Sequence, residues 1–212
     1  MRKHLQTGLI LGFTAIFVGY LSVWLVGPGA GLSFLGIELG EWLKFIGLGG
    51  RRDFFYLPPI TLGAMLALWT MIWAVQDWRA WAMRGLAVLI SLLAFPAIED
   101  ISGPVREQYT TRVFLIGCVM LLALLSAVWH PRGTWARLPW LLMALLAAVG
   151  LVLPAWLFLE IRPYLSDLFG QPVSAGIGFW LNGLGHGVVL VVCLLHLPST
   201  QDSAPVEVGR RA

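Results

Sequence analysis

The chain has 212 residues, of which 58% are apolar and only 12% carry a charge, whereas an ordinary soluble domain carries charge on about 25% of its residues. Its mean hydropathy is +0.82, and it contains several apolar runs of the roughly 20 residues that cross a bilayer. These values exclude a disordered chain, a disulfide scaffold and a nucleic-acid-binding protein, because there are only two cysteines and a formal net charge of +3 spread over short loops makes no basic patch. The composition indicates a polytopic helical membrane protein.

Apolar runs of at least about 18 residues predict an all-α fold, a compact bundle of six transmembrane helices. The predicted spans are residues 5–27, 55–75, 80–97, 110–129, 138–159 and 173–197. They form a single domain, 1–197, and the polar tail 198–212 is predicted to be disordered and cytoplasmic. The basic start followed by 23 apolar residues is interpreted as a retained first helix rather than a cleaved signal, because Pro28 stands where a small residue is needed.

The connection between the first two spans is long and patterned. Apolar residues recur at helical spacing in it, namely Leu32, Leu35, Leu39, Trp42, Leu43 and Ile46, while Glu38 and Glu41 fall on the opposite side. This pattern predicts an amphipathic helix over about 32–47 that lies in the outer interface of the membrane. It serves either as an anchor that covers the bundle or as a lid over a cavity.

The distribution of Lys and Arg sets the predicted orientation. Eight of the fourteen lie on the side that holds both termini: Arg2, Lys3, Arg79, Arg84, Arg132, Arg137, Arg210 and Arg211. The other side holds most of the acidic residues. By the positive-inside rule we expect both termini in the cytoplasm and the protein in the plasma (inner) membrane.

Stripes of small residues predict close contact between helices, which is how helices associate in lipid. They comprise Gly8, Gly12, Ala15, Gly19 and Ser22 in the first span, Gly63, Ala67, Thr70 and Ala74 in the second, Ala80, Ala87, Ser91 and Ala94 in the third, and Ala144, Ala148 and Ala155 in the fifth. Prolines at 58–59, 96 and 154 lie toward the outer ends of their spans, where we expect kinks or breaks. The lipid bilayer is one expected partner, and the small-residue faces predict another membrane protein or a second copy.

The last span carries the strongest polar pattern. Asn182, His186, Cys193 and His196 share one face, and Gly183 and Gly187 lie on another, where they predict a GxxxG helix contact. His186 falls near the midplane, so it is a candidate for ligand binding together with Asn182. The alternative is a neutral imidazole that is hydrogen-bonded within the bundle.

Two further groups are weaker candidates. His4, His130 and His196 stand at the cytoplasmic ends of three spans, which is how bundles can hold haem or a metal ion, although no cofactor is predicted. Glu99, Asp100 and Glu160 lie at the outer ends of the spans, with Arg112 and Arg162 nearby. They are candidates for acid–base catalysis or ligand binding, and the alternative is that they form ion pairs.

No span carries an Asp or Glu near its midplane, and the chain has no GxSxG, HExxH or Walker A motif. The sequence therefore favours a non-enzymatic subunit, either a membrane-embedded binding or transport subunit or an accessory subunit of a larger complex. The alternative is an intramembrane or interface enzyme that acts on a lipid-like substrate and uses the outer carboxylates and His186 as its catalytic groups.

Overall fold

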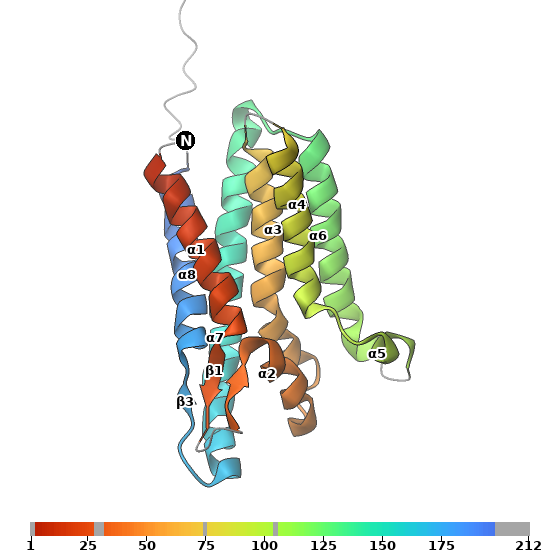
Figure 1. Ribbon diagram of the computed structural model, residues 1–212, viewed down its shortest axis with the longest axis vertical. Coiled ribbons are helices and arrows are strands. Elements are labelled where there is room, and N and C mark those ends of the chain that lie inside the picture. The colour runs from red at the N-terminus through yellow and green to blue at the C-terminus, as the bar shows by residue number, and fades with distance from the viewer. Residues whose placement is uncertain (1–2, 28–31, 74–75, 104–105, 198–212) are drawn as a thin grey trace, which may run out of the picture.

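The computed structural model describes residues 3–27, 32–73, 76–103 and 106–197. It is 83% helical and therefore nearly all-α, as predicted. In this part of the chain six long helices lie side by side with alternating direction (Figure 1): α1 (Lys3–Leu21), α3 (Leu57–Met71), α4 (Trp78–Ser91), α6 (Thr110–Val128), α7 (Leu138–Phe169) and α8 (Ile177–Leu195). Among the described residues, five helical stretches are long and apolar enough to cross a membrane; α4, with 14 residues, is not one of them.

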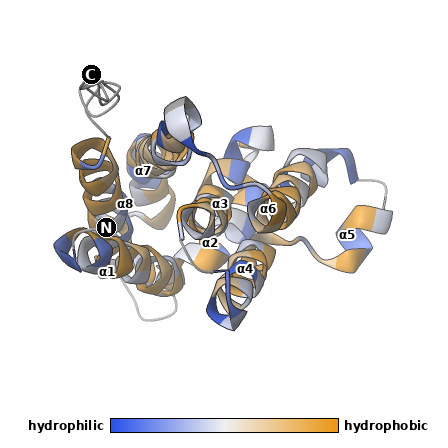
Figure 2. Ribbon diagram, turned by 90° about the horizontal axis from the view of Figure 1, so that it is seen from above, coloured by the Kyte–Doolittle hydropathy of each residue, from blue (hydrophilic) through white to orange (hydrophobic). Residues whose placement is uncertain are grey.

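The bundle has α3 near its centre. Seen from above, α1, α8 and α7 lie on one side of α3, and α4 and α6 lie on the other (Figure 2). Every residue of α3 after Leu57 is buried, which fits a helix that is apolar all round.

Small residues bring the helices together as predicted. A Cβ atom on Gly12 of α1 would lie 3.1 Å from the carbonyl oxygen of Gly185 in α8, and one on Gly19 would lie 2.5 Å from the amide nitrogen of Asn182. In the second pair of helices, a Cβ on Gly63 of α3 would lie 2.6 Å from the carbonyl oxygen of Ala87 in α4. These backbones touch only because glycine has no side chain.

The predicted first and sixth spans are wrong at their outer ends, where a small antiparallel sheet forms. Its strands are β1 (Val23–Val26), β2 (Phe34–Leu35) and β3 (Ser174–Ala175), in the order β2-β1-β3. Leu25 pairs with Ala175, and Val23 pairs with Leu35. Apolar β-branched residues suit a strand as well as a membrane helix, so hydropathy alone extended the helices too far.

The segment predicted as one interfacial helix over about 32–47 is only partly helical: it contains strand β2, and its helical part begins at Gly36 and is broken. It contains α2 (Gly36–Trp42), the 3-10 helix η2 (Leu43–Ile46) and, further on, the 3-10 helix η3 (Gly49–Tyr56). Gly47 ends η2 with a φ of 71°, a left-handed conformation that favours glycine. Leu39 and Leu43 are fully buried against the end of the bundle, so the apolar face was predicted correctly.

Proline has three different effects. Pro58 and Pro59 lie in the first turn of α3, where the missing N–H costs nothing, and Pro96 follows the 3-10 helix η4 (Leu92–Ala94) and precedes the short helix α5 (Ile98–Ser102). The expected break or kink at Pro154 does not end α7, which continues for 15 more residues to Phe169. One lost backbone hydrogen bond is tolerated in a helix supported by its neighbours.

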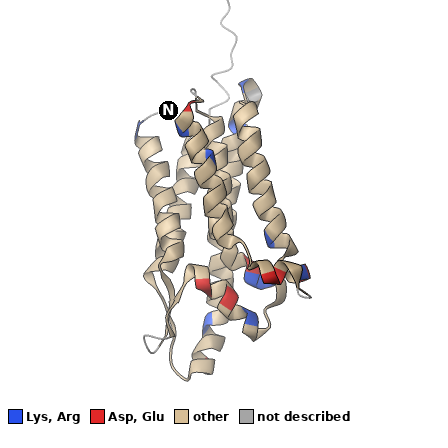
Figure 3. Ribbon diagram, turned by 45° about the vertical axis from the view of Figure 1, so that its right-hand side comes forward, with Lys and Arg blue, Asp and Glu red and all other residues tan. Residues whose placement is uncertain are grey.

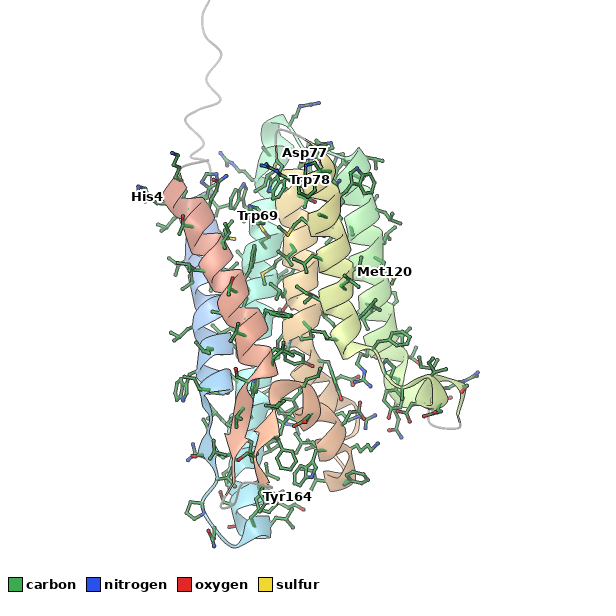
Figure 4. The ribbon with its side chains drawn as sticks, viewed as in Figure 1. His4, Trp69, Asp77, Trp78, Met120 and Tyr164 are labelled. Atoms are coloured by element: carbon green, nitrogen blue, oxygen red, sulfur yellow. The ribbon has the colours of Figure 1, made fainter. Side chains whose placement is uncertain are left out.

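The two ends of the bundle differ in chemistry. His4, Asp77 and Trp78 lie at the end where α1 begins and α8 stops, here named the terminal end, whereas Tyr164 lies at the opposite, sheet end (Figure 4). Charged residues gather toward these two ends, and the acidic ones lie mostly at the sheet end, near α2 and α5 (Figure 3). The remaining short helices are η5 (Arg106–Tyr109) at the sheet end and η6 (Gly133–Arg137) at the terminal end.

Candidate functional site

A cluster of buried polar side chains lies at the sheet end of the bundle. We name it the sheet-end cluster, and its members are Tyr20 of α1, Glu41 of α2, Arg52, Asp53 and Tyr56 of η3, Tyr109 of η5 and Arg112 of α6. Segments far apart in the sequence meet here because the loop between α1 and α3 folds back over the bundle.

The centre of the cluster is an ion pair between Glu41 and Arg112. The Arg112 side chain is 1% exposed, and both of its terminal nitrogens donate to Glu41 Oε1 at 3.2 Å. The Tyr56 hydroxyl donates to the same oxygen at 2.6 Å, and the guanidinium lies 3.8 Å from the centre of the Tyr56 ring. Stacking and charge-assisted hydrogen bonds offset part of the cost of burying Arg112, whose Nε atom has no hydrogen-bond partner among the described residues.

The electrostatics of Glu41 follow from these contacts. Burial raises the pKa of the Glu41 carboxyl, but the hydrogen bond from Tyr56 and the charge of Arg112 outweigh it, so the pKa lies below its ordinary value. The sequence pattern had placed Glu41 on the polar side of an interfacial helix. In the structure its side chain is half-buried and faces Arg112.

A second pair of charges, Arg52 and Asp53, lies beside the first. Arg52 is 3% exposed, stacks 4.8 Å from the centre of the Tyr109 ring and donates to Gln108 Oε1 at 3.4 Å. Asp53 is 9% exposed, and its Oδ1 atom has no hydrogen-bond partner in the described part of the chain. A buried oxygen without a partner costs about 1–3 kcal/mol, so Asp53 Oδ1 marks a place where a donor from outside the chain would be favourable.

Asp53 lines a cleft of about 420 Å³ between η3, η5, α6, α7 and the start of α3. The cleft is lined by Gly50, Asp53, Phe54, Leu57, Glu107, Gln108, Thr111, Leu115 and Leu153. Its polar residues come from η3, η5 and the first turn of α6, and its apolar residues come from η3, α3, α6 and α7. A lining that contains both kinds of residue suits an amphipathic molecule.

His186 is held inside the bundle between α3, α7 and α8. It is fully buried, with Nδ1 2.9 Å from the carbonyl oxygen of Asn182 and Nε2 3.1 Å from Thr61 Oγ1. Since a carbonyl only accepts, Nδ1 carries the proton. Nε2 lies within hydrogen-bond distance of the Thr61 hydroxyl, which donates to the carbonyl of Leu57 at 2.8 Å. Both ring nitrogens therefore lie within hydrogen-bond distance of groups on α3 and α8.

The predicted outer carboxylates do not meet His186. Glu99 and Asp100 lie on α5, which projects from the side of the bundle (Figure 1), and Glu160 forms an ion pair with Arg51 of η3. Arg162 is exposed on α7. Of the predicted ligand-binding residues, only Arg112 belongs to the sheet-end cluster.

The histidines predicted for a metal or haem do not gather into a site. His4 is exposed, and the His196 ring lies 4.1 Å from the Trp140 ring, centre to centre. Within the described ranges, no group of three or more His, Cys, Asp or Glu side chains is arranged to hold a metal ion.

The terminal end has a polar network of its own around Arg84. The Arg84 side chain is 4% exposed, and it donates through Nε to Ser126 Oγ at 2.9 Å and through Nη2 to the Ser126 carbonyl at 2.7 Å and to Gln76. Thr70 Oγ1 lies 3.0 Å from Ser126 Oγ, so α3, α4 and α6 are joined at one point. No carboxylate of the described residues forms an ion pair with this guanidinium.

The sequence itself indicated two of the buried charges, Arg84 and Arg112. Arg84 and Arg112 both fall inside predicted spans, and a charge inside a span is a functional or structural candidate. Arg84 was counted only among the charges of a flanking loop, whereas Arg112 was also a candidate for ligand binding. Nothing local marked Glu41, Asp53 or Tyr56, because their importance depends on which helices they meet.

No protein-family model, no curated protein and no solved structure matches the chain. The geometry of the chain itself therefore carries the functional argument.

Proposed function

We propose that the protein is a non-enzymatic, membrane-embedded binding subunit whose sheet-end cleft takes the headgroup of an amphipathic, lipid-like molecule. The observation that carries this proposal is Asp53: its Oδ1 atom is buried without a hydrogen-bond partner among the described residues, and the residue lines a cleft that has both polar and apolar lining residues. Neither feature alone would indicate a ligand, but together they describe a place for a polar head and a place for a chain.

The chemistry of the cleft favours a headgroup that donates hydrogen bonds. Asp53 and Glu107 are both acceptors when ionised, and Gln108 and Thr111 can donate or accept. Arg112 donates to Glu41 through both terminal nitrogens, and Arg52 stacks on Tyr109 and donates to Gln108. Neither arginine lines the cleft, so these cations are less available to an anionic group there. We therefore infer a headgroup that bears an amine, with its chain along the leucines of the cleft wall.

The proposed membrane arrangement has six crossings, with both termini in the cytoplasm and the protein in the plasma membrane. The crossing by α4 is supported by its length together with η4, 17 residues or about 25 Å, which is close to the thickness of a bilayer core. It is also supported by the packing of α4 against α3 and α6. In this arrangement the cleft opens at the outer surface of the membrane, where a headgroup would lie.

A binding measurement with lipids of different headgroups tests the proposal. The purified protein is incubated with short-chain phosphatidylethanolamine, which has an amine, or with phosphatidylglycerol, which has none, and retained lipid is counted by native mass spectrometry. We expect preferential retention of the amine lipid by the wild type and a loss of at least tenfold in Asp53→Asn, which keeps the shape but removes the charge.

Glu99→Gln is the matched control, because Glu99 is an exposed carboxylate on α5 outside the cleft. This variant should bind like the wild type. Equal retention of the two lipids by the wild type, or equal binding by Asp53→Asn and Glu99→Gln, would overturn the proposal.

A further inference from the structure

A donor inside the chain is complementary to the unpartnered oxygen of Asp53. The Nε atom of Arg112 is buried and, like Asp53 Oδ1, has no hydrogen-bond partner among the described residues. One atom is a donor and the other an acceptor, so each offers the group that the other lacks. Of the charges around Asp53, that of Arg112 acts on its carboxyl group most strongly. An amine that binds Asp53 therefore has a competitor within the chain.

The local geometry brings Arg112 to the side of η3 that carries Asp53. In a 3-10 helix, residues three apart lie on one side, so Asp53 shares the side of Tyr56. Arg112 stacks on the Tyr56 ring, with its guanidinium 3.8 Å from the ring centre. The Tyr109 ring lies against both arginines of the cluster, 4.9 Å from the guanidinium of Arg112 and 4.8 Å from that of Arg52. The positive charges of the cluster thus lie beside the Asp53 side of η3.

Glu41 engages the Arg112 guanidinium from α2. Both terminal nitrogens of Arg112 donate to Glu41 Oε1 at 3.2 Å, and the Tyr56 hydroxyl donates to the same oxygen at 2.6 Å. Lys44 lies 3.8 Å from Glu41 Oε2, but it is exposed, so solvent screens its charge. Neither Glu41 nor Arg112 lines the cleft. The buried pair therefore acts on the cleft through its charges and not through contact with an occupant.

The balance of charge around the cleft depends on Glu41. The sheet-end cluster and the cleft lining together hold three carboxylates, Glu41, Asp53 and Glu107, and two guanidiniums, Arg52 and Arg112, which is a formal excess of one negative charge. This excess favours one positive charge from outside. Without Glu41 the charges cancel, and Arg112 is released to repel an ammonium group or to pair with Asp53 itself.

We propose that Glu41 is a positioning residue for the amine headgroup: it holds Arg112, so that the Asp53 carboxylate stays available to the ligand. This inference rests on the proposed function and narrows its ligand to a headgroup with a single positive charge, because the surroundings of the cleft carry one negative charge in excess. Two residues outside the cleft thus set the charge that the cleft accepts.

Retention of short-chain phosphatidylethanolamine by the full-length protein at pH 7, counted by native mass spectrometry, tests this role. Glu41→Gln nearly keeps the shape of the side chain but removes its charge, so it should lower retention by roughly fivefold or more. The double variant Glu41→Gln/Arg112→Met lacks both buried charges and regains the excess of one negative charge. Its retention should return to within about twofold of the wild type, because an apolar pair can replace a buried ion pair. A merely structural role of Glu41 predicts no such rescue.

Glu41→Asp separates charge from stability. This variant keeps the carboxylate but shortens the side chain, so its thermal unfolding should resemble that of Glu41→Gln, while it should recover most of the lipid retention that Glu41→Gln loses. Equal losses of retention in the two variants would show that the shape of Glu41 matters and not its charge, and would overturn the inference.

Glu38→Gln is the matched control. Glu38 lies on the same helix but is exposed, and it accepts a hydrogen bond from the Leu35 amide that glutamine can also accept. This variant should bind like the wild type. Unchanged retention in Glu41→Gln, or no recovery in the double variant, would overturn this inference and leave the proposed function standing. Equal retention of phosphatidylethanolamine and phosphatidylglycerol by the wild type would overturn both.

Discussion

Gly150 lies where α7 approaches the Thr61–His186 pair, and we expect Gly150→Ala to destabilise the bundle. A Cβ on Gly150 would lie 2.6 Å from Thr61 Oγ1 and closer still to His186 Nε2. Neither group has room to withdraw, because His186 Nδ1 is bound to the carbonyl of Asn182 and Thr61 Oγ1 is packed 2.8 Å from the carbonyl of Leu57.

The magnitude follows from three terms. Forcing a methyl group into a filled core costs about 1–3 kcal/mol, and losing a hydrogen bond within a membrane protein adds about 0.6 kcal/mol. The higher helix propensity of alanine returns about 1 kcal/mol. The expected net loss in the free energy of unfolding is therefore about 0.6–2.6 kcal/mol.

Reversible unfolding in mixed micelles of a mild detergent and sodium dodecyl sulfate, followed by tryptophan fluorescence, measures this loss. Gly117→Ala is the matched control, because Gly117 is also helical but a Cβ there meets no atom within 4 Å. It should be neutral or stabilising by up to about 1 kcal/mol. In a His186→Ala background the cost of Gly150→Ala should fall, since the clashing imidazole is gone.

If Gly150→Ala were as stable as Gly117→Ala, the close packing of α7 on His186 would be refuted. An equal cost with and without the imidazole would show that the strain does not arise from His186.

Two further predictions concern the polar clusters. Tyr56 and Arg112 hold the pKa of Glu41 below its ordinary value of 4.5, so the ion pair contributes stability that is present above that value and is lost as the pH falls through the lowered pKa. Unfolding measured from pH 7 to pH 3 should show this acid-dependent loss in the wild type and a smaller one in Glu41→Gln; equal profiles would contradict it. At the terminal end, Ser126→Ala removes an acceptor of a charged donor and should cost about 1–2 kcal/mol in thermal unfolding, whereas the exposed Ser102→Ala should cost almost nothing. Equal costs for the two serine variants would show that the Arg84 network adds no stability.

The sequence by itself determined the features that depend on local pattern. Long apolar runs predicted the helices of the bundle, because a chain segment that is apolar for about 20 residues has few other stable arrangements. The glycines of α1 and Gly63 predicted close helix contacts for a similar reason, since small residues permit them wherever a partner comes near. Boundaries were less certain, and β1 was assigned to a helix because its residues are apolar in either structure.

Only the tertiary structure decided which polar residues matter. Glu41 and Arg112 are 71 residues apart in the sequence, and their pairing exists because the loop after α1 folds over the sheet end of the bundle. Asp53 became a candidate because its Oδ1 atom has no hydrogen-bond partner in the part of the chain that the structure describes, and no sequence pattern indicates this. The same holds for the two glycine faces of α8: the spacing of Gly178 and Gly185 is no more suggestive than that of Gly183 and Gly187, yet one face is covered by α1 and the other lies open. Contacts between segments that are distant in the sequence determine which side chains are buried. Burial in turn determines whether a charged residue needs a partner and whether a glycine lies in a helix contact.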